Sequence, residues 1–135
     1  MSEPLVVVDA DVLGRRRTGD ETYVRNLLRE LAALAPGAGL RLAAVARRPE
    51  LVPAGVEPLP LGVRVQELRM AWAFPRLLRR VGAALAHTQY AVPPRAPCPL
   101  VVTVHDLSFE REPGLMGRKD RFVFRAVVPR AVRAA

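Results

Sequence analysis

The chain has 135 residues, enough for one ordinary domain, and its half-hydrophobic, quarter-charged composition predicts a packed core and excludes a disordered chain. Its single cysteine, Cys98, excludes a disulfide framework and a four-cysteine zinc site. The net charge of +8 comes from 21 basic residues, all arginine except Lys119, and their scatter argues against a nucleic-acid partner, which needs a clustered basic stripe.

The first part of the chain predicts a strand, a helix and a second strand. Leu5 to Asp9 is an apolar, β-branched run typical of a strand buried on both faces. From Asp20 the apolar residues recur with a helical period, and Pro36-Gly37 ends this helix. A second apolar run, Leu40 to Ala46, follows directly. This order predicts a βαβ unit with parallel strands.

The middle of the chain is less regular. Arg47 to Gly62 holds four prolines and is expected to form no regular structure. Val63 to Val65 alternates and is expected to be a short strand. Arg69 to Val81 is expected to be helical, interrupted or restarted at Pro75.

The last part predicts two strands and a helix. Ala83 to His87 and Leu100 to Val104 are the strands, joined by a proline-rich loop from Gln89 to Pro99. Gly117 to Ala135 is expected to be helical, with no strand after it, which favours a fragment of a longer protein. The whole order predicts an α/β fold with an open, doubly wound, Rossmann-like parallel sheet. The face expected to be buried on the last helix comprises Phe122, Val123, Ala126, Val127 and Ala131.

Two histidines stand at predicted strand ends. Ligands of an open parallel sheet bind beyond the carboxyl ends of its strands, and His87 and His105 both fall there, the second followed by Asp106. Histidine titrates near neutrality and is intermediate in burial. Each can therefore be a proton acceptor, a partner for a sugar hydroxyl or a packed structural residue.

The loop from Asp9 to Gly19 is a second candidate site. It joins the first strand to the first helix, where backbone N–H groups and the helix dipole can hold a phosphate. Its glycines fit neither the dinucleotide fingerprint nor a P-loop. The alternative needs no ligand: Thr18 or Asp20 caps the helix and Glu21 stabilises its first turn.

Other kinds of site find no support in the sequence. The histidines and carboxylates lack the spacing of a metal site, and no serine lies in a nucleophile elbow. Glu3 and Pro4 stand where a signal peptide needs basic residues, and no uncharged run is long enough to span a membrane. A cytoplasmic location is therefore expected.

Several short motifs occur in the order found in one enzyme family. The last of them, a strand entering His105-Asp106-Leu107, is the most specific. The set covers nearly the whole chain and resembles the N-terminal part of glycosyltransferase family 4. It comprises Val8-Asp9-Ala10-Asp11, Arg17-Thr18-Gly19, Tyr23 to Leu28, Trp72, Leu77-Leu78, Ala86-His87 with Tyr90 and Pro93, and Val101 to Leu107.

The resemblance implies a GT-B architecture, in which two Rossmann-like domains face each other across a cleft. Residues 1–135 correspond to the first part of the N-terminal, acceptor-side domain, and the donor-binding domain is absent from this chain. The implied activity is retaining transfer of a hexosyl group from a nucleotide sugar to a hydroxyl acceptor, with no essential metal and no other cofactor.

The resemblance also implies roles for individual residues. His105 is the expected catalytic residue. Thr18 and Gly19 are expected on the side of the donor phosphates. The acceptor or sugar pocket is expected to contain Asp9, His87, Tyr90 and Asp106. The chain alone is expected to be inactive and to self-associate.

A binding module without catalysis is the alternative function. A basic, partly apolar segment of the middle helix can lie on an anionic membrane or on nucleic acid. The same pattern also fits an ordinary amphipathic helix with solvated arginines. The segment comprises Arg69, Trp72, Phe74, Arg76, Arg79 and Arg80.

Overall fold

The structure is a computed structural model that describes residues 2–16, 18–105 and 118–135. Its strands are β1 (Leu5–Asp9), β2 (Arg41–Ala46), β3 (Glu57–Pro60), β4 (Ala83–Gln89) and β5 (Leu100–Thr103). Its helices are α1 (Thr18–Leu34), α2 (Gln66–Leu68), α3 (Phe74–Val81) and α5 (Arg118–Ala134). A 3₁₀ turn covers Pro49–Leu51, and a π-helical turn, Arg69–Ala73, joins α2 to α3.

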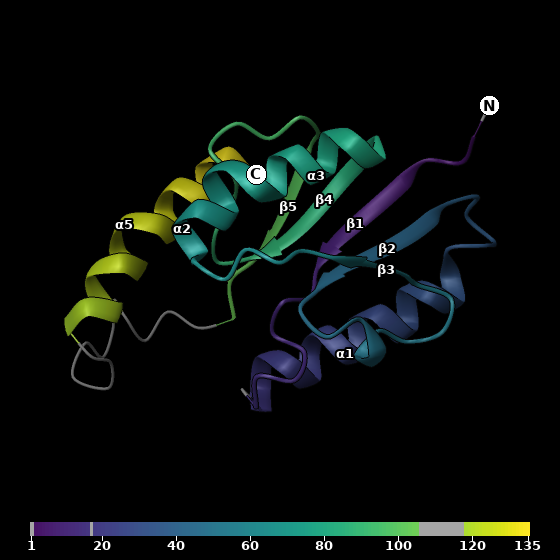
Figure 1. Cartoon of the computed structure of the whole chain (residues 1–135), viewed down its shortest axis with the longest axis horizontal. Coiled ribbons are helices and arrows are strands. Elements are labelled where there is room, and N and C mark those ends of the chain that lie inside the picture. Colours follow the sequence, from purple (N-terminus) through teal and green to yellow (C-terminus); the bar gives the residue numbers. More distant parts are fainter. Residues whose placement is uncertain (1, 17, 106–117) are drawn as a thin grey trace.

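The five strands form one open, all-parallel sheet in the order β3-β2-β1-β4-β5. Figure 1 shows α1 on one side of this sheet and the α2–α3 segment on the other. Strand order reverses between β1 and β4, as in Rossmann-like folds. The predicted α/β fold with a doubly wound parallel sheet is therefore confirmed.

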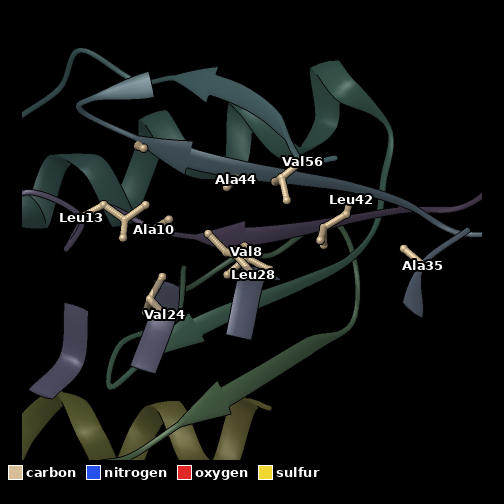
Figure 2. Packing of buried hydrophobic residues seen from close by; sticks show 10 residues of the cluster. Val8, Ala10, Leu13, Val24, Leu28, Ala35, Leu42, Ala44 and Val56 are labelled. Carbon is tan, nitrogen blue, oxygen red and sulfur yellow. The ribbon is translucent and has the colours of Figure 1, made fainter. Parts of the chain in front are cut away.

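Two hydrophobic clusters hold the helices to the sheet, one on each face. Val7 and Val8 are neighbours in β1 and both are fully buried, yet they belong to different clusters. Successive side chains of a strand point to opposite faces, so a strand in the centre of the sheet must be apolar throughout. Figure 2 shows Val8 beside Val24 and Leu28 of α1. Phe74 of α3 is buried in the other cluster.

The structure corrects the prediction for the middle of the chain. The stretch that was expected to be irregular contains β3, which pairs in parallel with β2 through Glu57 to Pro60. Pro58 and Pro60 cannot donate ladder hydrogen bonds, but β3 is an edge strand, where proline is tolerated. The short strand expected at Val63 to Val65 is wrong, because these residues form neither strand nor helix.

The second helical segment is longer than predicted. It begins at Gln66, three residues before Arg69, and continues to Val81. Pro75 lies in the first turn of α3, where a missing N–H costs little, and does not end the helix. Gly82, with φ of 68°, ends it in the left-handed conformation.

The remaining elements differ from expectation by one or two residues. The first helix begins at Thr18 instead of Asp20, β4 continues to Gln89, and β5 ends at Thr103. Among the side chains of α5 that the structure describes, Val128 and Ala131 are buried. The expected contributions of Phe122 and Val123 lie outside the side chains that the structure describes, and Ala126 and Val127 are half-buried.

Candidate functional site

A crevice lies where the strand order reverses. The last residues of β1 and β4, Asp9 and Gln89, line a cavity of about 730 Å³ together with Tyr90. Its other walls come from the π-helical turn, including Arg69, and from the second half of α5, including Ala131. Parallel sheets of this type bind ligands at this reversal point. The crevice is thus the first candidate site.

A buried ion pair forms the floor of the crevice. Arg69 donates from Nη1 to Asp9 Oδ2 at 2.9 Å and from Nη2 to Asp9 Oδ1 at 2.6 Å. Only 1% of Arg69 and 6% of Asp9 is exposed. Burial alone would lower the pKa of Arg69, but the hydrogen bonds and charge of Asp9, with the charge of Asp11, raise it overall. The guanidinium therefore stays charged and satisfies both oxygens of Asp9.

A second carboxylate extends this network. Asp11 accepts from Arg47 Nε at 2.8 Å on Oδ1 and from Arg15 Nη1 at 3.3 Å on Oδ2. Its backbone N–H donates to Asp9 Oδ1 at 3.2 Å. Arg69 Nε lies 3.9 Å from Asp11 Oδ1 and has no hydrogen-bond partner among the described residues. Near the end of β1, the acidic charge is thus already paired with arginines of the same chain.

A cluster of histidine, tyrosine and threonine side chains forms beside the crevice. His87 Nε2 lies 2.7 Å from Thr103 Oγ1, and the Tyr23 hydroxyl lies 3.2 Å from the same oxygen. The His105 ring meets the Tyr23 ring edge-on with centroids 4.5 Å apart, and the Tyr90 ring is 5.6 Å away. Three elements, α1, β4 and β5 with its following residues, converge here.

The electrostatics of the cluster differ between its two histidines. Burial lowers the pKa of His87, and the nearby His105 lowers it further, so His87 is neutral at neutral pH. The Thr103 hydroxyl can then donate to His87 while it accepts from Tyr23. His105 Nε2 is buried without a hydrogen-bond partner among the described residues. Such a buried polar atom ordinarily acquires a partner.

Tyr90 connects the cluster to the crevice. It lines the crevice and packs its ring near His105. Its φ of 60° is the left-handed conformation that a tyrosine rarely adopts, and its N–H donates to the Thr103 carbonyl at 3.0 Å. Strained backbone of this kind concentrates at functional sites.

The loop after β1 is held by a carboxylate from the first turn of α1. The Gly14 N–H donates to Glu21 Oε1 at 2.9 Å, and Arg25 donates to the same oxygen at 2.8 Å. This loop amide is therefore satisfied without a ligand, by a carboxylate of α1. Gly19 is different: a Cβ placed there would meet no atom within 4 Å apart from its chain neighbours and the backbone of its own helix.

The structure separates the predicted site residues into groups. His87, Tyr90 and His105 come together, whereas Asp9 lies in the arginine network and Gly19 in the first turn of α1. Asp106 and the side chain of Thr18 lie outside the described residues.

The sequence interpretation missed Tyr23, Thr103 and the site role of Arg69. Arg69 was expected on a surface but is buried. The sequence signal that could have pointed to Tyr23 and Thr103 is that each places one hydroxyl group in an otherwise apolar segment.

Two further observations concern the described part of the chain only. Residues 2–16, 18–105 and 118–135 contain no group of three or more His, Cys, Asp or Glu side chains arranged to hold a metal ion. Within the same residues, every helix is too short or too polar to cross a bilayer.

Comparison of the chain with protein-family models, with curated proteins and with solved structures finds no match. The class that the fold and the site define is a Rossmann-like α/β domain. Its candidate site is a crevice at the strand reversal, flanked by a histidine–tyrosine cluster.

Proposed function

We propose that residues 1–135 form the first part of the N-terminal, acceptor-side domain of a retaining glycosyltransferase of the GT-B class. Two independent lines support the proposal. The ordered motifs from Val8 to Leu107 resemble glycosyltransferase family 4, and the chain has the Rossmann-like sheet that this class requires. A cytoplasmic location, expected from the sequence, belongs to the same proposal.

The observation that carries the proposal is the environment of His105. Its Nε2 is buried without a partner among the described residues, and two tyrosine rings flank the imidazole. Aromatic faces and an imidazole nitrogen together suit a sugar, which presents apolar C–H faces and hydroxyl groups. In the proposed mechanism His105 hydrogen-bonds a sugar hydroxyl, and its backbone carbonyl faces the positive charge that develops at the anomeric carbon.

The remaining expected residues take supporting roles. Tyr90 lines the crevice next to His105 and positions the acceptor, and His87 is held neutral by burial. Gly19, open in the first turn of α1, lets the backbone approach the donor phosphates. Helix termini and basic side chains then stabilise the departing diphosphate, with no step assigned to a metal. Asp9 lines the crevice and holds Arg69 through both of its carboxylate oxygens.

Catalysis in this scheme needs a second, donor-binding wall. One wall leaves the donor phosphates in water, where each electrostatic contact is weak. The chain alone is therefore expected to bind acceptor saccharides without transferring sugar. Transfer is expected only from a protein in which this domain faces a donor-binding domain.

Titration of the chain with mono- and oligosaccharides, followed by NMR chemical shifts, tests the acceptor site. Expected are shifts at Tyr23, Tyr90 and His105, and loss of binding in His105→Ala. The matched control is Arg29→Ala on the exposed surface of α1. Saccharide binding unaffected by His105→Ala would contradict the assigned site.

The reaction itself is tested with a protein that joins this domain to a donor-binding domain. A panel of nucleotide sugars is assayed with and without EDTA, and His105→Ala is assayed beside Arg29→Ala. Complete loss of transfer on chelation would overturn the metal-free part of the proposal, and full activity of His105→Ala would overturn the role of His105.

A further inference from the structure

A second hollow lies along the same helical segment as the crevice but shares no lining residue with it. This open groove has a volume of about 670 Å³. Its walls come from the chain after β3 and from the π-helical turn and α3. The residues that define the groove are Leu61, Val63, Trp72, Arg76, Arg79 and Arg80.

Apolar side chains are exposed in this groove and in the chain that leads into its helical wall. Trp72 is 51% exposed, and the preceding residues Val65 and Leu68 are 58% and 49% exposed. Arg76 lies over the Trp72 ring, 5.1 Å from its centroid, and so keeps the indole at the surface beside a positive charge. The opposite side of the segment is buried against the sheet through Phe74 and Leu78. The segment is therefore amphipathic, with a face that the described chain does not cover.

The structure corrects which residues belong to this face. Arg69 and Phe74, which the sequence pattern placed on it, are buried. Leu61 and Val63 take their place from the chain that follows β3. The result is a groove with an apolar floor and a basic rim, in place of a helix stripe alone.

The charge of the groove has one sign. Arg76, Arg79 and Arg80 are exposed, and in the described part of the chain none of them forms a salt bridge. Among the described residues no acidic side chain lines the groove, and the nearby Glu67 lines the crevice instead. Three unpaired cations around an exposed indole call for a partner that is anionic and apolar at once.

We propose that this groove docks on the surface of an anionic lipid bilayer. A bilayer surface offers both properties within a few ångströms: anionic headgroups attract arginine, and tryptophan is favoured at headgroup level. The helical segment lies in the plane of the interface, with Trp72 and Leu68 entering the headgroup layer. Nucleic acid fits less well, because a strand-binding groove places several stacking aromatics between its charges, and the described lining of this groove contains one, Trp72.

Docking of this kind extends the proposed function without depending on it. It assigns a surface to membrane contact that is separate from the crevice. The surface binds in the same way whether the crevice holds a sugar or not.

Trp72 is the only tryptophan in the chain, so its fluorescence reports docking directly. The chain is mixed with phosphatidylcholine vesicles and with vesicles containing phosphatidylglycerol as well. Expected are a blue shift of the emission and co-sedimentation with the anionic vesicles only. Raising the salt concentration is expected to release the chain, because exposed charges are screened.

A charge-removal variant and a matched control test the site. Arg76→Gln, Arg79→Gln and Arg80→Gln are combined, and vesicle affinity is expected to fall on the order of 100-fold. The control combines Arg29→Gln, Arg95→Gln and Arg133→Gln, which removes the same charge from exposed positions outside the groove. The control is expected to keep its affinity within a few-fold, and thermal unfolding checks that both variants fold.

Specific outcomes would overturn the proposal. An equal loss of vesicle affinity in the control variant would show that net charge, and not the groove, determines binding. Binding without a blue shift of Trp72 would place the contact elsewhere. A single-stranded RNA that binds more tightly than the anionic vesicles, and loses binding in the groove variant, would assign the groove to nucleic acid.

Discussion

Arg69 and Asp9 form a bidentate ion pair although they lie 60 positions apart in the chain, with Nη–Oδ distances of 2.6 and 2.9 Å. The pair fastens the π-helical turn to the end of β1. A π-helical turn holds an extra residue and often marks a functional site. Here it brings an arginine to the point where the strand order reverses, and so shapes the crevice.

Removing the arginine is expected to lower the stability of the fold. Arg69→Met leaves the Asp9 carboxylate buried without its partner, which costs about 3–5 kcal/mol in comparable buried pairs. Urea unfolding measures the loss of free energy of unfolding. The control, Arg41→Gln, breaks the exposed pair with Glu57 and is expected to cost less than about 1 kcal/mol.

The same pair allows a sharper experiment. Combining Arg69→Met with Asp9→Leu removes both charges and is expected to recover part of the stability lost in Arg69→Met alone. If the double variant is less stable than the single one, the pair contributes through packing and not through an uncompensated charge.

Gly14, in the loop after β1, and Gly19, in the first turn of α1, are expected to respond to substitution in opposite ways. Gly14 has φ of 83°, and a Cβ there would lie 2.8 Å from Leu51 Cδ1 and 2.9 Å from Arg48 Cδ. Gly14→Ala is therefore expected to lower the free energy of unfolding by about 1–3 kcal/mol. Gly19→Ala meets open space and is expected to leave the fold as stable or slightly more stable.

Gly19 then separates a role in folding from a role in binding. Thermal unfolding and donor affinity are measured on the same Gly19→Ala protein, within a protein that also holds a donor-binding domain. Weaker binding of nucleotide sugar at unchanged stability is the result expected from the proposed function. Unchanged binding would remove Gly19 from the donor site.

The buried His87 predicts a pH dependence of stability. Its pKa is lowered in the folded chain by burial and by His105. Above about pH 6.5 the imidazole is neutral in both states and makes no difference. As the pH falls below that value, the unfolded chain takes up the proton first, so the free energy of unfolding declines until the pH passes the folded pKa.

Urea unfolding at several pH values between about 5 and 8, the range in which histidine titrates, measures this decline. His87→Gln is expected to remove its share of the slope below pH 6.5. An identical slope in His87→Gln and in the parent chain would show that other groups cause the dependence.

Local sequence patterns predicted much of the fold because its central elements are locally encoded. The apolar run ending at Asp9 and the helical period after it need no tertiary information, and both occur as expected. By contrast, β3 was missed because prolines argue against a strand unless its place at the sheet edge is known.

The candidate site was less predictable for the same physical reason. Strand-end placement pointed to His87 and His105, but no local signal places Thr103 between His87 and Tyr23. A rule that places charged residues on the surface misplaces Arg69, because its burial depends on a carboxylate 60 residues away in the chain. Local sequence propensity determines where helices and strands form, whereas ion pairs between residues distant in the chain form only after these elements have packed together.

The two edge strands of the described sheet, β3 and β5, differ in their capacity to pair with another chain. At one end, Pro58 and Pro60 deprive β3 of two N–H donors and discourage pairing with another chain. At the other end, β5 carries no proline from Leu100 to Thr103, and Val101 is 43% exposed. We therefore expect the chain to self-associate by pairing at β5.

Light scattering over a concentration series tests the expected pairing. The parent chain is expected to grow in mass with concentration, and Val101→Lys is expected to hold it monomeric because a charge on an edge strand opposes pairing. The matched variant combines Pro58→Val with Pro60→Val, which restores donors to β3 and is expected to increase association.

A parent chain that stays monomeric at every concentration would show that β5 is already protected. Association undiminished in Val101→Lys would place the contact on another surface, of which the apolar residue Val132 of α5, 55% exposed, is the next candidate.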